Sequence, residues 1–151
     1  MITAQVESMF EALEEALPML RLHYEELALN KDKVPLDPDW DAYRALDENG
    51  KILCVTLREN GRLVGYFTGF ITPDLHYRTC LSLKMDIFWT HPDIRGGTAS
   101  LRLFRAVGKE ARRRGVQRTF YGSKNHKDAS KLFEALGMEK VETYYSEWIG
   151  D

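Results

Sequence analysis

The stretch DIFWTHPDIRGGTASLRLFRAVGKEARRRG, residues 86–115, decides the fold. It begins with an apolar run typical of a β-strand, is interrupted by Gly96 and Gly97, and continues with apolar residues at helical spacing. Gly115 is the expected helix stop. In a strand, glycine loop and helix of this order, the backbone N–H groups around residues 95–101 have no intrahelical acceptor. Such a helix N-terminus favours anions, phosphate groups among them.

This loop matches neither of two common phosphate-binding patterns. The GxGxxG spacing of dinucleotide-binding folds is absent, and no Gly-Lys-Ser or Gly-Lys-Thr of a Walker loop follows. On spacing alone, a plain turn before an ordinary helix is an equal alternative to an anion site. The rest of the chain has to decide between the two.

Outward from this stretch, the chain reads as a mixed sheet with helices. Apolar, β-branched segments at 52–58 and 63–71, joined through Asn60-Gly61, predict an antiparallel hairpin. Further strands are predicted at 81–90, 116–121 and 140–148, with a helix at 127–136. The N-terminal part predicts the following: a helix from Val6 that Pro18 ends, a second helix from Leu20, a loop at 31–40, and a short helix capped by Asp39 or Asp41. This order predicts an α/β (mixed α+β) fold, with a central, mostly antiparallel sheet and helices on both faces.

Two motifs in sequence order resemble the GNAT superfamily of acyl-CoA N-acyltransferases. The loop at Arg95 resembles that family's R/Q-x-x-G-x-G/A motif, and NHKDASKLFEALGM at 125–138 resembles its N-x-x-A-x-x-L-Y-x-x-x-G-F segment. The resemblance covers roughly residues 50–149 and implies the GNAT fold in a single domain, residues 1–151. The segments HYEEL, LVGY and PDLHY, beginning at residues 23, 63 and 73, are similar to small GNAT proteins encoded by bacteriophages.

Composition excludes several other classes of protein. No apolar run approaches the ~18 residues of a membrane span, and the acidic N-terminus does not resemble a signal peptide, so a cytoplasmic protein is expected. Cys54 and Cys80 lack metal-ligand spacing and are expected as reduced thiols, with no metal site. The net charge is −2, and the basic cluster at 109–118 is interpreted as a solvated helix face, so no nucleic-acid partner is expected.

The resemblance implies transfer of an acetyl group from acetyl-CoA to a primary amine of an unidentified small molecule or protein. Backbone amides of the loop and the Arg95 guanidinium would bind the pyrophosphate, and a strand edge would pair with the amide arm of the cofactor. The residues assigned to the cofactor are Phe88, Trp89, Thr90, Arg95, Gly96, Gly97, Thr98, Ala99, Ser100, Asn125 and His126.

The chain departs from the family pattern at three positions. Thr98 and Ser100 replace small residues of the loop, where their hydroxyls would donate to phosphate or Thr98 would cap the helix. Phe133 stands where many relatives carry the tyrosine that protonates the leaving sulfur. Tyr144 and Tyr145 are the nearest replacements. On a strand only one of them can face the cleft, and plain core or surface packing is the alternative.

Asp86 is the candidate general base, because a carboxylate in an apolar strand is costly unless it is used or paired. A structural aspartate bound to Lys84 or to a loop is the alternative.

Tyr24, Glu25 and His76 are candidates for binding the acceptor. A GNAT-fold protein that binds coenzyme A or a partner protein without catalysis is the second functional hypothesis. The sequence leaves the oligomeric state open, a homodimer included.

Overall fold

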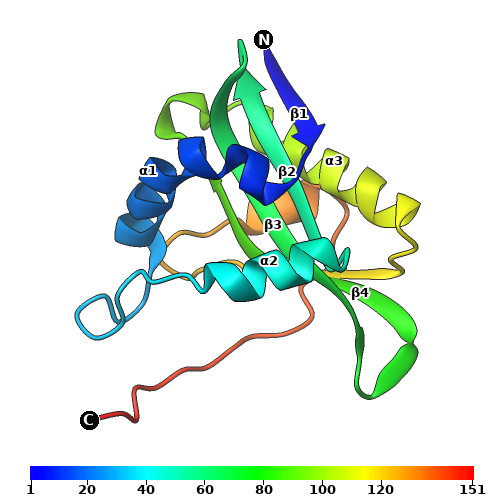
Figure 1. Ribbon diagram of the computed structural model, residues 1–151. Helices are drawn as coiled ribbons and strands as arrows, with labels where there is room; N and C mark the ends of the chain where they lie inside the picture. The colour runs from blue at the N-terminus through cyan, green and yellow to red at the C-terminus, as the bar shows by residue number, and fades with distance from the viewer.

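The computed structural model describes residues 1–151 and contains one five-stranded sheet in the order β1-β2-β3-β4-β5. Neighbouring strands are antiparallel except β4 and β5, which are parallel (Figure 1). The elements are β1 (Ile2–Val6), α1 (Met9–Leu27), α2 (Trp40–Glu48), β2 (Ile52–Glu59), β3 (Arg62–Asp74), β4 (Tyr77–Thr90), a 3-10 turn (Pro92–Ile94), α3 (Ala99–Arg113), β5 (Arg118–Phe120) and α4 (Ser130–Ala135). No helix combines the length and the apolar character needed to cross a membrane.

Helices cover both faces of the sheet, as the sequence predicts. Adjacent residues of β3 point to opposite faces. Phe67 packs edge-on against Phe104 of α3, with ring centroids 5.6 Å apart, whereas the Tyr66 hydroxyl contacts His23 of α1. The α3 face holds the apolar core, whose fully buried members include Leu53, Val55, Leu57, Phe67, Leu83, Leu103 and Val107. The α1 and α2 face is more polar and carries the candidate chemistry described below.

A β-bulge in β4 reverses which face its side chains occupy. Met85 pairs with Gly69 and Ile87 pairs with Thr68, so Asp86 between them is the extra residue. Before the bulge, Leu83 belongs to the α3-face core, and after it Phe88 packs against that same core. Strict alternation would place those two residues on opposite faces. The bulge therefore turns Asp86 toward α1 and α2.

β4 and β5 separate after a short parallel contact. Their pairing covers only Ser82–Lys84 against Arg118–Phe120. From Met85 to Thr90, β4 pairs with β3 on one side, and no strand pairs with its other edge. The sheet is therefore open beside the second half of β4, directly ahead of the glycine loop.

Local turn and cap signals in the sequence are confirmed. Asn60 and Gly61 have φ angles of 51° and 84° in the hairpin between β2 and β3. Asp39 caps α2 by accepting from the N–H of Ala42 at 2.9 Å. Gly115 has a φ of 84° just past α3, as a left-handed helix stop requires.

The N-terminal prediction was wrong in two respects. Val6 ends strand β1 rather than beginning a helix, and α1 runs unbroken through Pro18. Proline removes a backbone donor and usually frees a carbonyl one turn earlier. Pro18 and Glu14 are both exposed, so water can satisfy the freed carbonyl of Glu14.

The C-terminal predictions were also partly wrong. Helix α4 is shorter than expected, because Lys127 forms an isolated bridge with Lys124 and Asp128 accepts from the N–H of Ser130 at 2.9 Å just ahead of the helix. Residues 140–148 form no strand, although their composition favours one, because the chain brings no partner strand beside them.

Candidate active site

The glycine loop before α3 presents free backbone donors. The N–H groups from Gly96 to Leu101 bond to no acceptor of the protein, and the side chain of Thr98 does not cap the helix. A Cβ atom added at Gly96 or Gly97 would meet no atom within 4 Å, so the surface in front of these amides is open. The first turn of α3 contains no acidic residue. The anion site expected from the sequence is therefore sterically and electrostatically accessible.

The Arg95 side chain ties this loop to α1. Its Nη1 and Nη2 atoms donate to the two carboxylate oxygens of Glu26 at 2.7 and 3.0 Å, and its Nε donates to the Thr90 carbonyl at 2.9 Å. The guanidinium also lies 5.5 Å from the centroid of the Trp89 ring. These contacts occupy the guanidinium and hold it on the α1 side. The contact of Arg95 with a phosphate stays a prediction.

The Glu26 carboxylate has three partners, which come from three parts of the chain. Besides Arg95 and Trp89, whose indole N–H donates at 3.4 Å, the ammonium of Lys127 lies 3.3 Å from its carboxylate. Burial opposes ionisation here, but the hydrogen bonds from Arg95, Trp89 and Lys127 and the charge of Arg95 outweigh it and lower the pKa of Glu26 to about 2. Glu26 thus stays charged and holds α1, the glycine loop and the β5–α4 loop together.

The free edge of β4 at residues 88–90 lies beside this cluster. Phe88 packs its ring against Phe104 and Phe133, and Trp89 is only 2% exposed and stacks on Tyr66. Both side chains are therefore used in packing. The backbone of this segment is what remains available to a ligand.

Asp86 sits between α2 and β3 with one oxygen engaged and one free. Its Oδ2 accepts from the Tyr43 hydroxyl at 2.5 Å and from the Thr68 hydroxyl at 3.2 Å, whereas its Oδ1 has no partner in the protein. Burial and the neighbouring carboxylate raise the pKa of Tyr43, so that phenol remains a donor. Lys84 is not its partner, since Lys84 binds Asp74 at 2.6 Å. Asp86 is therefore an oriented carboxylate with a free acceptor atom.

His23 and Tyr66 form a second polar pair on the same face. His23 Nδ1 lies 2.8 Å from the Tyr66 hydroxyl, and burial lowers the pKa of His23 to about 4, which keeps the ring neutral near physiological pH. Tyr66 and Thr68 are two residues apart on β3 and share a face. The pair thus lies along the strand from the Asp86 cluster.

The residues predicted to bind the acceptor are dispersed. Tyr24 donates to the carbonyls of Lys31 and Val34 and so braces the loop after α1, while Glu25 next to it is exposed. His76 was expected near the cleft. It lies instead in the exposed turn of the β3–β4 hairpin, because both strands extend beyond the sheet body (Figure 1).

The remaining predicted residues lie in loops. Asn125 and His126 are exposed in the β5–α4 loop, next to Lys127, which contacts Glu26. Tyr144 and Tyr145 are 85% and 93% exposed and lie on no strand, so the expectation that one of them faces the cleft was wrong. The reason is the missing partner strand noted above.

Sequence reasoning missed two tyrosines. Tyr43 lies on the short helix α2, 43 residues before Asp86. No local pattern in the sequence indicates a contact between residues so far apart. Tyr121 follows β5 and packs within an aromatic cluster with Phe67, Phe104 and Phe133. Its sole sequence signal is its position at the end of a predicted strand.

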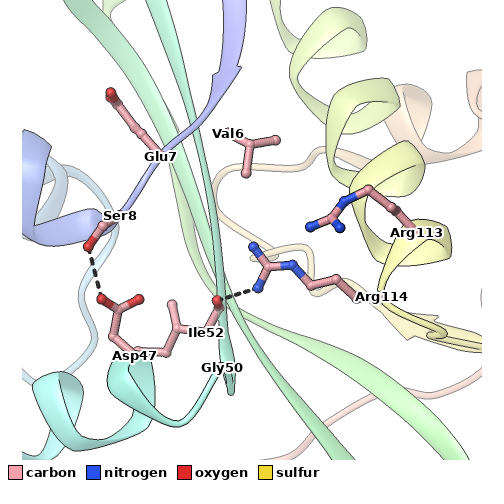
Figure 2. Close-up of a pocket in the computed structure, with 8 residues that line it drawn as sticks. All are labelled: Val6, Glu7, Ser8, Asp47, Gly50, Ile52, Arg113 and Arg114. Carbon is pink, nitrogen blue, oxygen red and sulfur yellow. Dashed lines mark hydrogen bonds between the residues drawn. The ribbon is translucent and has the colours of Figure 1, made fainter.

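A larger cavity, about 460 Å³, lies at the other end of α3. Figure 2 shows Arg113 and Arg114 on one side of it and Ser8 and Asp47 on the other. These groups are already paired: Ser8 donates to Asp47 at 2.9 Å, and both arginines bind Glu110. A smaller cavity of about 210 Å³ adjoins the glycine loop at Gly97, Thr98 and Ala99. The larger cavity is therefore separate from the candidate site.

The structure thus combines an open glycine loop ahead of α3, a parallel strand pair that separates, and a half-buried carboxylate at a bulge of β4. The chain belongs to the acetyltransferase (GNAT) family, whose sequence model matches residues 7–138. A search of curated protein sequences finds no match.

Solved structures share the fold at low sequence identity. The ribosomal-protein-alanine N-acetyltransferase of Brucella melitensis biovar Abortus 2308 is 17% identical with a TM-score of 0.72, covering 99% of this chain and 100% of that one. An aminoglycoside acetyltransferase from an uncultured soil metagenomic sample is 17% identical with a TM-score of 0.76, covering 99% of each chain. A predicted acetyltransferase with acetyl-CoA from Clostridium acetobutylicum is 14% identical with a TM-score of 0.69, covering 99% of this chain and 97% of that one.

Proposed function

We propose that the protein is an N-acetyltransferase that moves an acetyl group from acetyl-CoA to a primary amine of a small molecule or protein. The observation that carries this proposal is the run of unpaired amides from Gly96 to Leu101, open to solvent beside an unpaired edge of β4. The family of the chain supports it, and one structural neighbour is described with acetyl-CoA. The likeness of HYEEL, LVGY and PDLHY to phage proteins supports a bacteriophage origin.

The residues present fit such a cofactor. Amides of residues 96–101 would hold a diphosphate, and the free backbone edge at residues 88–90 would accept and donate hydrogen bonds to an amide-containing arm. When bound, acetyl-CoA supplies the thioester from which the acetyl group comes. The chain itself has to bind the cofactor, orient the amine and remove its proton.

Asp86 is proposed as the proton acceptor for the amine. Tyr43 and Thr68 fix one oxygen of the carboxylate, and the free Oδ1 is available to take a proton. Both fixing groups are hydroxyls, which hold the carboxylate in place through one oxygen and leave the other free. An ammonium form of the acceptor is attracted by the same carboxylate before it is deprotonated.

Calorimetry and turnover together test this function. Acetyl-CoA should bind the wild-type protein, and an amine panel should reveal an acceptor through release of free thiol. Asp86→Asn should keep cofactor affinity and lower kcat by roughly 10²–10⁴-fold, the usual contribution of a general base. Asp41→Asn, the same change at a carboxylate exposed on α2, is the matched control and should retain activity. Unchanged kcat in Asp86→Asn would refute its role, and absence of cofactor binding would refute the function itself.

A second candidate is a coenzyme A-binding module without catalysis, favoured by the missing hydroxyl at Phe133. It predicts thermal stabilisation by acetyl-CoA with no thiol release from any amine. Ligand at 100 times its dissociation constant should add ~2.7 kcal/mol of stability in either case. Release of free thiol with any one amine of the panel would show that the protein is an enzyme and would exclude the binding module.

A further inference from the structure

Breaking a thioester leaves negative charge on sulfur, and a hydrogen-bond donor aimed at that atom stabilises the departing group. Phe133 offers no such donor, and Tyr144 and Tyr145 are exposed on the C-terminal segment. Another hydroxyl near the open β4 edge would have to supply that donor.

Tyr121 stands at the point where the sheet opens. The last β4–β5 pair joins Lys84 to Phe120, so Tyr121 is the first residue beyond the pairing. A Cβ atom at the next residue, Gly122, would lie 3.8 Å from the end of the Met85 side chain. The backbone just after β5 therefore still lies beside Met85, where the free edge of β4 begins.

The ring of Tyr121 lines the α3 and α4 side of this opening. Its centroid lies 4.9 Å from that of Phe104 and 5.7 Å from that of Phe133. Phe88, on the free edge itself, packs against the same two rings at 4.9 and 6.2 Å. Of the tyrosines, Tyr121 alone packs against Phe133, so its phenol is next to the position where a hydroxyl is missing.

Asp86 and Tyr121 lie on opposite faces of the sheet at the same level. Asp86 follows Met85 in β4 and faces α2, where it accepts from the Tyr43 hydroxyl. Tyr121 packs against Phe67 on the α3 face. In a direct displacement the amine approaches the carbonyl carbon from one side, and sulfur departs toward another. A carboxylate on one face and a phenol on the other match these two directions.

We infer that the Tyr121 hydroxyl donates a hydrogen bond to the sulfur as it leaves, an inference that rests on the function proposed above. The amine nitrogen forms a bond to the carbonyl carbon, the carbon–sulfur bond breaks, and its electron pair stays on sulfur. The proton lost by the amine goes to Asp86 and then to water. The thiolate is stabilised by the phenol and is protonated by water after release.

Burial raises the pKa of Tyr121 to about 12, although the Thr119 side chain opposes the shift, so the phenol keeps its proton near neutral pH. A phenol of that pKa does not transfer its proton fully to a thiol of pKa ~8.5, and a hydrogen bond is the interaction expected. This predicts that Tyr121 lowers the pKa of a bound thiol instead of acting as an acid that is consumed.

Tyr121→Phe removes only the hydroxyl and keeps the ring packing. We expect unchanged coenzyme A affinity in calorimetry and an unchanged KM. We expect kcat to fall by about 10- to 100-fold, at or below the lower end of the losses for a single oxyanion donor. The thiol pKa of bound coenzyme A, followed by the ultraviolet absorbance of its thiolate, should rise in the variant. Tyr145→Phe, which removes an exposed hydroxyl, is the control for both measurements.

Rescue provides a second measurement. Because the two rings are neighbours, Phe133→Tyr in the Tyr121→Phe background should restore part of kcat and of the thiol pKa shift. An unchanged thiol pKa and kcat in Tyr121→Phe, with coenzyme A still bound, would overturn the inference alone. Loss of coenzyme A affinity without a pKa change would assign Tyr121 a packing role and overturn it as well. No coenzyme A binding by the wild-type protein would overturn the proposed function together with the inference.

Discussion

At the scale of single residues, Glu26 is the group on which the arrangement of the site depends most. Its carboxylate holds Arg95 of the glycine loop, Trp89 of the free edge and Lys127 of the β5–α4 loop. Because the pKa of Glu26 falls from 4.5 to about 2 on folding, its ionised form stabilises the native state. This contribution is present above the unfolded pKa and is lost as the pH falls through the folded pKa.

Glu26→Gln should therefore be less stable than the wild type by about 1–2 kcal/mol at neutral pH, a value discounted for partial exposure of the pair. The difference should shrink as the pH falls from about 4.5 to about 2. Urea unfolding midpoints measured across that range test this. Glu25→Gln is the control, because that neighbouring side chain is exposed and forms no ion pair. A stability difference that is constant with pH would contradict the account.

At the scale of elements, the N-terminus of α3 lacks the side-chain cap and the acidic first-turn residues that usually stabilise a helix start. Thr98 precedes the helix without a side-chain cap, and no acidic residue offsets the positive end of the helix dipole. Natural helices commonly place carboxylates there. Their absence leaves the loop less stable and its amides free for an anionic ligand.

Thr98→Asp should separate these two effects. The added carboxylate should raise the free energy of unfolding by about 0.3–1 kcal/mol through the helix dipole, while it repels a diphosphate and weakens acetyl-CoA binding at least tenfold. Thermal denaturation and calorimetry measure the two quantities. Thr98→Asn has a similar shape without the charge and should keep most of the affinity. Equal affinities in the two variants would argue against a phosphate at this loop.

At the scale of the whole molecule, the chain divides into a packed body and an extended C-terminal segment. Residues 139–151 form no backbone hydrogen bond with the body, and in Figure 1 this segment runs away from the sheet to the C-terminus. Its large apolar side chains are exposed: Val141, Tyr144, Tyr145, Trp148 and Ile149. A contact of the Lys33 ammonium with the Trp148 ring, 5.1 Å from its centroid, joins it to the loop after α1.

Deletion of residues 139–151 should therefore change stability little. Loss of one exposed cation–π contact amounts to about 0.5–1 kcal/mol, which lowers Tm by no more than ~4 °C in a domain of this size. Acetyl-CoA affinity should be retained. Calorimetric melting of the truncated and full-length chains, with and without cofactor, measures both. A larger loss of Tm would show that the segment packs on the body in solution.

Much of this architecture could be predicted because its signals are local. The Asn60-Gly61 hairpin, the Asp39 cap and the glycine loop before α3 each depend on a few neighbouring residues and their allowed backbone angles. The free amides of residues 96–101 follow from the same local logic, since any helix that begins there leaves its first donors unpaired.

The chemistry of the site could not be read in this way. Alternation along β4 does not reveal the bulge at Asp86, which depends on pairing with β3, and the contact of Asp86 with Tyr43 joins residues far apart in sequence. Helix α1 continues through Pro18 because its freed carbonyl is exposed to water, although proline locally favours a helix end. The C-terminal segment forms no strand because no partner strand lies beside it, although its composition favours one.

The sequence by itself thus determined the order of the central elements, the turns and a loop with free amides ahead of α3, since these arise from short-range backbone geometry. Only the tertiary structure decided that Glu26 forms an ion pair with Arg95 and that Asp86 faces α2. The same is true of the packing of Tyr121 against Phe133. These relations depend on strand register and on helix docking, which are set by contacts between distant segments and leave no periodic mark in the chain.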